Sequence, residues 1–317
     1  DLFEILLFSV LTLAFIEGEN FVVVHRQYRS VKSAFSTYVV PEIVDDIVEQ
    51  GMSTEQKGVL KEVTVLFSDI QDFTQITEEL QPEQIITLLN TVFTPVTEQI
   101  MHNQGMLDKY IGDEVMAVFN APIDIPDYRN KSVDAAIGIQ TSIQDTNKQL
   151  EALGLPPVRL SLGIAAGPVT LGNMGTALRL SYTAVGNTVN LAARMTSLSK
   201  IYGQQILITR DLWQNLSDAH KQRFQFIDRV IVKGRSKKTE LYGIESVESE
   251  PNEYLQTAYI RAFELYGRGD FDQAKKAFSD LVSQYQHQAS HCLHLRCMEL
   301  IEAQPENWNG VYKFGHK

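Results

Sequence analysis

The chain has 317 residues, a length that accommodates one large domain or two modest ones. Its apolar content of 44% supplies a sizeable core, and its formal net charge is −11 at pH 7. Nucleic-acid-binding proteins present a basic face to phosphates, so this acidic balance argues against a nucleic-acid partner. The two cysteines, Cys292 and Cys297, lie five residues apart in a predicted helix, so no disulfide framework organises the fold.

The first segment, residues 1–18, is predicted to be the end of a transmembrane helix. Residues 2–16 are almost entirely apolar, but a helix of this length spans only about 22 Å, less than a bilayer needs. A truncated spanning helix explains the shortfall. The basic residues that follow it are His25, Arg26, Arg29 and Lys32. Positive charge beside a spanning helix marks the cytoplasmic side, so we expect attachment to the plasma (inner) membrane with a cytoplasmic remainder.

Residues 19–58 are interpreted as a helical linker that couples the membrane to the rest of the chain. Between Asn20 and Gln50, apolar residues recur at three- and four-residue intervals, a helical pattern that Pro41 interrupts. A polar stretch from Gly51 to Gly58 follows.

Residues 59–247 alternate between predicted strands and helices and are expected to form one domain. The expected elements are a strand at 63–67, a helix at 82–103, a strand hairpin at 107–110 and 115–119, a helix at 127–150, a strand pair at 159–165 and 169–173 joined by Ala166-Gly167-Pro168, a helix at 188–200, an extended segment at 205–208, and strands at 224–232 and 239–242. Because hairpins are frequent, we expect an α+β fold: a mixed, palm-type or ferredoxin-like sheet covered by helices.

Residues 248–317 are predicted to be a helical extension. Ala262, Gly267, Gly269, Ala274 and Phe278 fit the pattern of a single tetratricopeptide-like helix pair. One such repeat cannot bury its own apolar face. We therefore expect it to pack on the preceding domain, on a second copy of the chain or on the helix that follows, and to offer a possible site for a protein partner. Three histidines (His287, His291, His294) share helical spacing there, and ordinary helix surface is favoured over a metal site for them.

Two carboxylates stand out by their positions. Asp69 follows the first predicted strand, and Asp113 lies at the tip of the hairpin, where Gly112 permits a tight turn. If that strand lies beside the hairpin, both acids project from the same end of the sheet. Paired carboxylates that face a triphosphate suit two magnesium ions, which prefer oxygen ligands. Either acid alone would be interpreted as a solvated turn residue.

Five motifs in order extend over roughly residues 62–243. They are Phe67–Thr74 (FSDIQDFT), Lys109–Glu114 (KYIGDE), Gly172–Gly175 (GNMG), Tyr182–Arg194 (YTAVGNTVNLAAR) and Val232–Gly234 (VKG). Together they resemble the motifs of class III adenylyl and guanylyl cyclases, in particular bacterial membrane-anchored adenylate cyclases. The resemblance implies that the domain converts ATP to 3′,5′-cyclic AMP and pyrophosphate by two-metal catalysis at a homodimer interface, in signal transduction.

The resemblance also implies roles for single residues. Asp69 and Asp113 would bind two Mg²⁺ ions per site, with Mn²⁺ as a substitute, and the Ile70 carbonyl would assist. Asn190 would position the ribose, and Arg194 would stabilise charge on the transferring phosphorus. Their i, i+4 spacing places both on one helix face, which suits one joint task.

Five further residues would bind the remainder of the nucleotide. The backbone amides of Phe73 and Thr74, together with Lys233, would hold the terminal phosphates. Lys109 and Thr183 would recognise the base. Lys109 supplies only hydrogen-bond donors and Thr183 can accept, which suits adenine rather than guanine. Because a hydroxyl can also donate, Thr183 predicts looser selectivity than the aspartate found in many adenylyl members.

The family resemblance implies that each site is shared between two catalytic domains, with the metal acids from one and the base, ribose and phosphorus contacts from the other. A chain that carries both halves once is therefore expected to work as a homodimer with two equivalent sites. Three alternatives stay open: a guanylate cyclase, a non-catalytic nucleotide-binding regulatory homologue, and a cyclic dinucleotide synthase. The last is disfavoured because it does not explain Asn190 and Arg194.

Overall fold

The structure is a computed structural model that describes residues 58–176, 179–232 and 237–314, apart from the side chains of residues 179 and 180. The predicted membrane segment and all of the predicted linker except Gly58 lie outside the described residues, as does Lys233. Within the described ranges, no helix is both long enough and apolar enough to span a membrane.

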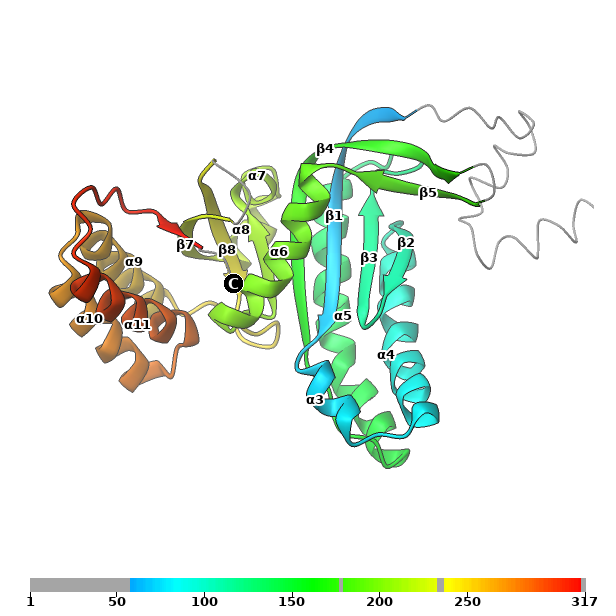
Figure 1. The fold of residues 1–317 in the computed structure, drawn as a ribbon, viewed down its shortest axis with the longest axis horizontal. Helices are drawn as coiled ribbons and strands as arrows, with labels where there is room; N and C mark the ends of the chain where they lie inside the picture. Colours follow the sequence, from blue (N-terminus) through cyan, green and yellow to red (C-terminus); the bar gives the residue numbers. More distant parts are fainter. Residues whose placement is uncertain (1–57, 177–178, 233–236, 315–317) are drawn as a thin grey trace, which may run out of the picture. The chain divides into compact units, whose positions relative to one another are not determined.

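A single mixed sheet organises the described chain (Figure 1). Its strands are β1 (Val59–Ile70), β2 (Met106–Ile111), β3 (Glu114–Phe119), β4 (Leu160–Thr176), β5 (Arg179–Val185), β6 (Ile206–Thr209), β7 (Gln225–Ile231), β8 (Thr239–Ile244) and β9 (Tyr312–Lys313). Its helices are α3 (Phe73–Glu78), α4 (Pro82–His102), α5 (Tyr128–Ala152), α6 (Asn187–Tyr202), α7 (Arg210–Trp213), α8 (Asp218–Arg223), α9 (Glu253–Arg268), α10 (Phe271–Tyr285) and α11 (Gln288–Ala303). The strand order is β2-β3-β1-β4-β6-β8-β7-β9, and β5 pairs with β4 outside this path.

The half of the sheet that carries the site has a ferredoxin-like topology. Strands β2, β3, β1 and β4 pair antiparallel in that spatial order. Helix α4 connects β1 to β2 and helix α5 connects β3 to β4, which is the β-α-β-β-α-β arrangement. Parallel pairing of β4 with β6 then makes the sheet mixed, as expected from the sequence.

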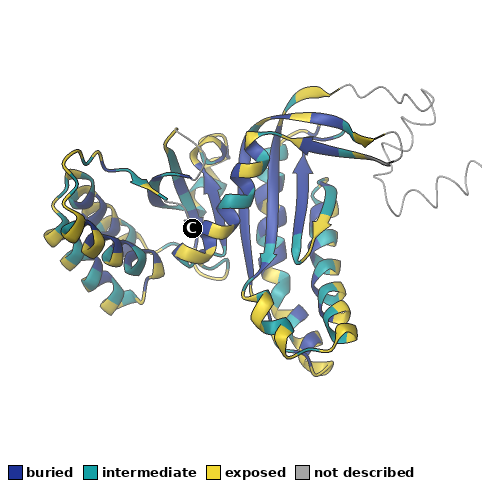
Figure 2. Cartoon of the chain, viewed as in Figure 1, coloured by how far each residue is buried: buried dark blue, intermediate teal, exposed yellow. Residues whose placement is uncertain are grey.

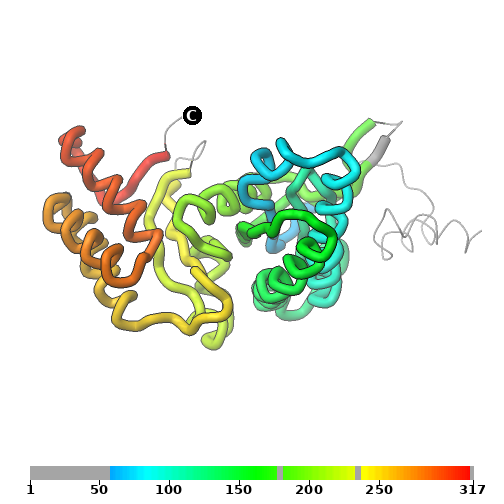
Figure 3. Tube along the Cα trace, turned by 90° about the horizontal axis from the view of Figure 1, so that it is seen from below, coloured from blue at the N-terminus to red at the C-terminus, as the bar shows by residue number. Residues whose placement is uncertain are grey.

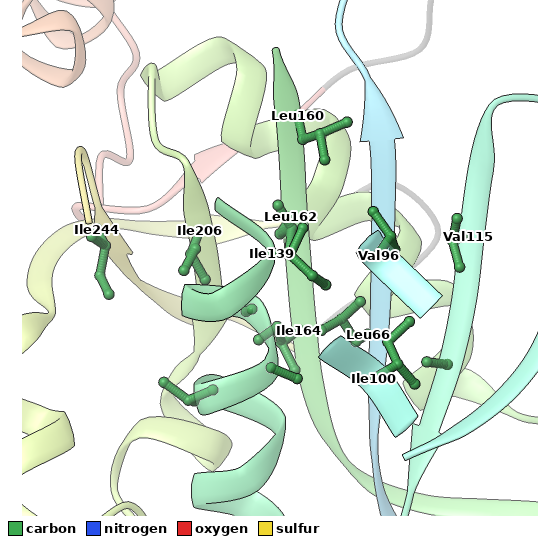
Figure 4. Packing of buried hydrophobic residues seen from close by; sticks show 14 of the residues in the cluster. Leu66, Val96, Ile100, Val115, Ile139, Leu160, Leu162, Ile164, Ile206 and Ile244 are labelled. Carbon is green, nitrogen blue, oxygen red and sulfur yellow. The ribbon is translucent and has the colours of Figure 1, made fainter. Parts of the chain in front are cut away.

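The main core lies between one face of this sheet and the helices α4 and α5. Figure 4 shows Val96 and Ile100 of α4 and Ile139 of α5 close to Leu66 and Leu162 of the sheet, and all five are fully or almost fully buried. In Figure 2 the central strands are buried along most of their length, whereas the helices expose their outer faces. Side chains alternate between the two faces of a strand, so Asp69, an odd number of residues from Leu66, points away from this core.

Helix α6 packs on the opposite face of the sheet, and Gly163 of β4 permits its close approach. A Cβ atom at position 163 would lie 2.2 Å from the backbone nitrogen of Thr196 and 2.6 Å from the carbonyl oxygen of Ala192. Only a residue without a side chain lets α6 lie so close to β4. The face toward which Asp69 points is therefore the face that α6 covers.

The expected strand pair at 159–165 and 169–173 is wrong, because these residues form one continuous strand, β4. Turn-forming residues such as Ala166-Gly167-Pro168 favour a reversal of the chain when they are considered alone. Gly167 has a φ of 152°, but β1 pairs with β4 from Leu160 to Leu171, on both sides of that segment. A long partner strand therefore keeps the chain extended through Pro168, and the strand that does reverse onto β4 is β5, which was not predicted.

The C-terminal helices α9, α10 and α11 lie side by side and adjacent to β7 and β8 (Figures 1 and 3). The buried side chain of Arg296 in α11 forms an ion pair with Asp228 of β7 and donates a hydrogen bond, 2.9 Å long, to the Tyr202 hydroxyl at the end of α6. Strand β9 also pairs with β7. The extension is thus joined to the preceding domain through buried polar contacts.

The histidines of α11 and its N-cap do not gather around a common point. Nδ1 of His287 lies 2.8 Å from the Ser290 hydroxyl, and Nδ1 of His294 lies 3.1 Å from the Lys275 carbonyl. In the part of the chain that the structure describes, no three His, Cys, Asp or Glu side chains form a metal-binding group.

Candidate active site

The structure brings the two predicted metal acids together. Asp69, the next-to-last residue of β1, lies directly opposite Glu114 of β3. Asp113 is the second residue of the two-residue hairpin loop that precedes Glu114. Gly112 has a φ of 64°, the conformation that a tight hairpin turn favours in glycine. The Asp113 carboxyl consequently lies close enough to the Asp69 carboxyl to share a proton with it when one of the two is protonated.

Crowding of these acids changes their proton affinity. Burial, and then the hydrogen bond and the charge of Asp69, raise the pKa of Asp113 from 3.8 to about 6. Burial first, and then the charge of Asp69, also raise the pKa of Glu114, while the Lys200 ammonium acts in the opposite direction. Close carboxylates that repel each other are a set of oxygen donors suited to a divalent cation.

Lys200, in the last turn of α6, was not predicted as a site residue. Its Nζ lies 2.6 Å from Oδ2 of Asp69, and the two side chains are 35% and 13% exposed. A lysine in the last turn of a helix is ordinarily explained by the helix dipole, so the sequence carried no signal for this contact. The fold alone places the ammonium beside the acid.

The two residues predicted to recognise the base also lie together. Lys109 Nζ donates a hydrogen bond of 3.0 Å to Oγ1 of Thr183, although the residues are 74 positions apart. Asp108, which was not predicted, contacts both. Its Oδ2 accepts a 2.7 Å hydrogen bond from the Thr183 hydroxyl, and its Oδ1 lies 3.0 Å from Lys109 Nζ.

Asn190 and Arg194 both belong to α6, but the structure does not bring Asn190 to the acids of the same chain. Asn190 is exposed and Arg194 is half-buried. The α6 residue that contacts Asp69 is Lys200, ten positions beyond Asn190, which corresponds to about 15 Å along the helix axis. Within one chain, Asn190 therefore lies apart from the acids.

Phe73 and Thr74 are the first two residues of α3, which begins shortly after the Asp69 end of β1. Their N-cap, Asp72, has a φ of 57°, and its carboxylate lies 3.5 Å from Arg159. The first amides of a helix have no partner within that helix, so both backbone N–H groups are candidates for an acceptor from outside it. Ile70 is buried and pairs with Leu160.

Comparisons with known proteins agree on one family. Residues 55–246 match the family described as the adenylate and guanylate cyclase catalytic domain. The chain is 32% identical over 213 residues to adenylate cyclase 1 of Rhizobium meliloti, a match that covers 67% of this chain and 32% of that protein. It is 30% identical over 220 residues to an adenylate cyclase of Anabaena cylindrica, covering 67% of this chain and 43% of that one.

Solved structures give the same family. The adenylyl cyclase CyaB from P. aeruginosa is 29% identical with a TM-score of 0.56, covering 62% of this chain and 98% of that chain. The guanylyl cyclase Cya2 is 30% identical with a TM-score of 0.54, covering 62% and 97%. The match with this chain spans less than half the length of the adenylate cyclases of Rhizobium meliloti and Anabaena cylindrica. The chain belongs to the family of adenylate and guanylate cyclase catalytic domains.

Proposed function

We propose that the chain is the catalytic part of an adenylate cyclase, which converts ATP to 3′,5′-cyclic AMP and pyrophosphate. The observation that carries this proposal is the convergence of Asp69 and Asp113 at one end of the sheet, in a family whose named members are nucleotide cyclases. The conversion is an intramolecular attack by the ribose 3′-hydroxyl on the α-phosphorus, with pyrophosphate as the leaving group.

Asp69 and Asp113 would hold two divalent cations, Mg²⁺ or Mn²⁺, with help from the Ile70 carbonyl. The fit rests on the donor set: two adjacent carboxylates, of which Asp113 has a pKa raised first by burial and then by the nearby Asp69. When bound, such ions lower the pKa of the attacking hydroxyl and stabilise the leaving phosphates. The chain's own contribution is to fix both acids on the rigid end of β1 and on a tight hairpin.

The remaining residues would bind and orient the nucleotide. The amides of Phe73 and Thr74 would donate to phosphate oxygens, and Lys233 would add a positive charge there. Asn190 would hold the ribose so that its 3′-oxygen faces the α-phosphorus. The Arg194 guanidinium would stabilise the negative charge that develops on the equatorial oxygens during attack.

Selectivity for adenine is proposed from the contact between Lys109 and Thr183. Adenine presents an acceptor at N1 and an amine donor at C6, whereas guanine presents a donor at N1 and a carbonyl acceptor at C6. The Lys109 ammonium matches the first acceptor, and the Thr183 oxygen matches the amine. Named relatives include adenylate cyclases, and solved neighbours include both adenylyl and guanylyl cyclases, so the preference rests on these two residues.

A homodimer with two composite sites is proposed from the separation of Asn190 from Asp69 within one chain. Two copies related by a two-fold axis would place Asn190 and Arg194 of one copy over the acids of the other. Attachment to the plasma (inner) membrane through residues 1–18, with the catalytic domain in the cytoplasm, is proposed from the sequence pattern alone.

The direct test is to incubate the purified chain with ATP or GTP, in Mg²⁺ or Mn²⁺, and identify the products by mass spectrometry. We expect cyclic AMP and pyrophosphate, with ATP preferred, and no product from the Asp113→Asn variant. Cyclic GMP as the main product would establish a guanylate cyclase instead. A cyclic dinucleotide, or no product from a folded and nucleotide-binding chain, would overturn the proposal.

A further inference from the structure

A β-bulge in strand β2 places two successive side chains against the same residue, Thr183. Leu107 pairs with Ala117 and Lys109 pairs with Met116, so Asp108 is the extra residue between two adjacent partners. In a regular strand, Asp108 and Lys109 would point to opposite faces. The bulge re-aims them, and both contact Thr183.

Asp108 is built into the fold as a fully buried acceptor. Its side chain has no exposed surface, whereas that of Lys109 is 38% exposed. Oδ2 accepts from the Thr183 hydroxyl at 2.7 Å and from the Ala184 amide at 3.3 Å. Oδ1 is buried beside the Lys109 ammonium and has no directed hydrogen bond within the described chain. An ionised carboxylate can only accept hydrogen bonds, so the partner is the donor in each of these contacts.

This contact fixes the polarity of the Thr183 hydroxyl. A threonine hydroxyl has one proton and two lone pairs. The proton is directed to Asp108, and one lone pair accepts from Lys109. The only hydrogen-bonding capacity left on Thr183 is an acceptor.

We propose that Asp108 is a specificity-determining residue: by taking the Thr183 proton, it makes that hydroxyl an obligate acceptor that selects a purine with an amine at C6 and rejects one with a carbonyl. Asp108 acts through Thr183 and is therefore a positioning residue. The inference rests on the proposed adenylate cyclase function and deepens it. On this proposal the selectivity is tighter than Thr183 alone predicts, because Asp108 and Thr183 together offer the base what a single carboxylate would.

The decisive variant is Asp108→Asn, which keeps the shape of the side chain. The carbonyl oxygen of the new amide would face the Lys109 ammonium, and its NH₂ group would face Thr183. The Ala184 amide would lose its 3.3 Å hydrogen bond to this side chain, which is the longer of the two that Oδ2 accepts. The new amide would then donate a hydrogen bond to the Thr183 oxygen. The Thr183 hydroxyl would be free to rotate and donate its O–H to a carbonyl at C6 of the base. We expect the ratio of kcat/KM for ATP to kcat/KM for GTP to fall by about 10-fold or more. Inosine triphosphate, which has a carbonyl at C6 and no amine at C2, should gain in the same way.

A second variant separates this role from a structural one. In a Thr183→Val background there is no hydroxyl to polarise, so adding Asp108→Asn should leave the ATP to GTP ratio unchanged. Asp145→Asn, which removes an equal charge from an exposed site on α5, is the matched control and should leave the wild-type ratio unchanged. Thermal unfolding of every variant checks that it is folded.

The outcomes distinguish this inference from the proposed function. Wild-type protein that prefers GTP would overturn the proposed function. Wild-type protein that prefers ATP, with the same ratio in folded Asp108→Asn, would overturn the role of Asp108 alone. An equal change of the ratio with and without the Thr183 hydroxyl would also overturn it, because the effect would not pass through Thr183.

Discussion

Lys200 Nζ lies 2.6 Å from Oδ2 of Asp69 and connects the last turn of α6 to the end of β1. The same ammonium also counteracts the burial of negative charge on Glu114. A fixed positive charge beside a proposed metal ligand repels an incoming divalent cation and competes for the same carboxylate oxygen. We therefore expect this contact to raise the metal concentration that the proposed site requires.

Replacing Lys200 by methionine should lower the Mn²⁺ concentration that half-saturates the protein by about fivefold, the size expected for a partly exposed ion pair. The measurement is the midpoint of thermal unfolding as a function of Mn²⁺ concentration, since a ligand that binds only the folded state raises it. Lys148→Met, which removes a lysine from an exposed pair with Asp145, should leave the requirement unchanged. A higher Mn²⁺ requirement in Lys200→Met would contradict this effect.

Asp113→Asn should abolish catalysis and at the same time stabilise the metal-free protein. Burial and Asp69 raise the pKa of Asp113 to about 6, so keeping this acid ionised at pH 8 lowers the free energy of unfolding. A neutral amide removes that cost, and we expect a gain of about 1 kcal/mol after solvent screening. Chemical denaturation with a metal chelator present measures the gain.

Addition of Mn²⁺ provides the internal check on that variant. It should raise the unfolding midpoint of the wild-type protein far more than that of Asp113→Asn. A variant that is both less stable than wild type and equally stabilised by Mn²⁺ would show that Asp113 is an ordinary turn residue.

The buried His287 predicts a pH dependence of stability. Burial lowers the pKa of His287 from 6.5 to about 4. Between these values the unfolded chain binds a proton that the folded chain does not, so stability is present above pH 6.5 and is lost as the pH falls toward 4. The loss is at most about 3 kcal/mol. His287→Gln should abolish this part of the profile, measured by urea unfolding at pH 7 and pH 4.5.

His291, one turn further along α11 and less buried, is the matched control for that experiment. His291→Gln should leave the difference between the two pH values as it is in the wild type. An unchanged difference in His287→Gln would mean that other groups cause the acid sensitivity.

Arg296→Met should destabilise the chain by about 3–5 kcal/mol, because it leaves the fully buried Asp228 without its cation. Thermal or urea unfolding measures this loss. The double variant Arg296→Met with Asp228→Asn should recover much of it, since the uncompensated charge is then gone. A double variant as unstable as the sum of two single losses would show that packing, and not the charge pair, determines the effect.

Much of the central fold could be predicted because local patterns and tertiary pairing agree there. The apolar run Val63–Phe67, the Gly112 turn and the amphipathic segment from Pro82 gave β1, the hairpin and α4 close to their observed positions. The prediction was wrong for the Ala-Gly-Pro segment in β4, because its turn-forming residues indicate a reversal locally, whereas pairing with β1 keeps the chain extended.

The predicted site residues that the structure brings together all belong to the family motifs, whereas Asp108 and Lys200 lie outside those motifs and were not predicted. Asp69 and Asp113 were expected to converge, and Lys109 and Thr183 to share a task, and the structure places each pair together. Asp108 was missed because regular strand alternation puts it on the other face from Lys109, and a bulge leaves no mark in the sequence.

The most direct test of the composite two-chain site is activity on mixing two inactive variants, Asp69→Asn and Asn190→Ala. Each variant alone should produce no cyclic AMP. After dissociation and random reassociation in equal amounts, about half of the dimers contain one copy of each variant. Each mixed dimer has one intact site out of two, so we predict about a quarter of the wild-type cyclic AMP production. If both variants fold and dimerise but the mixture stays inactive, or if either variant alone is active, then acids and Asn190 from different chains do not form the catalytic site.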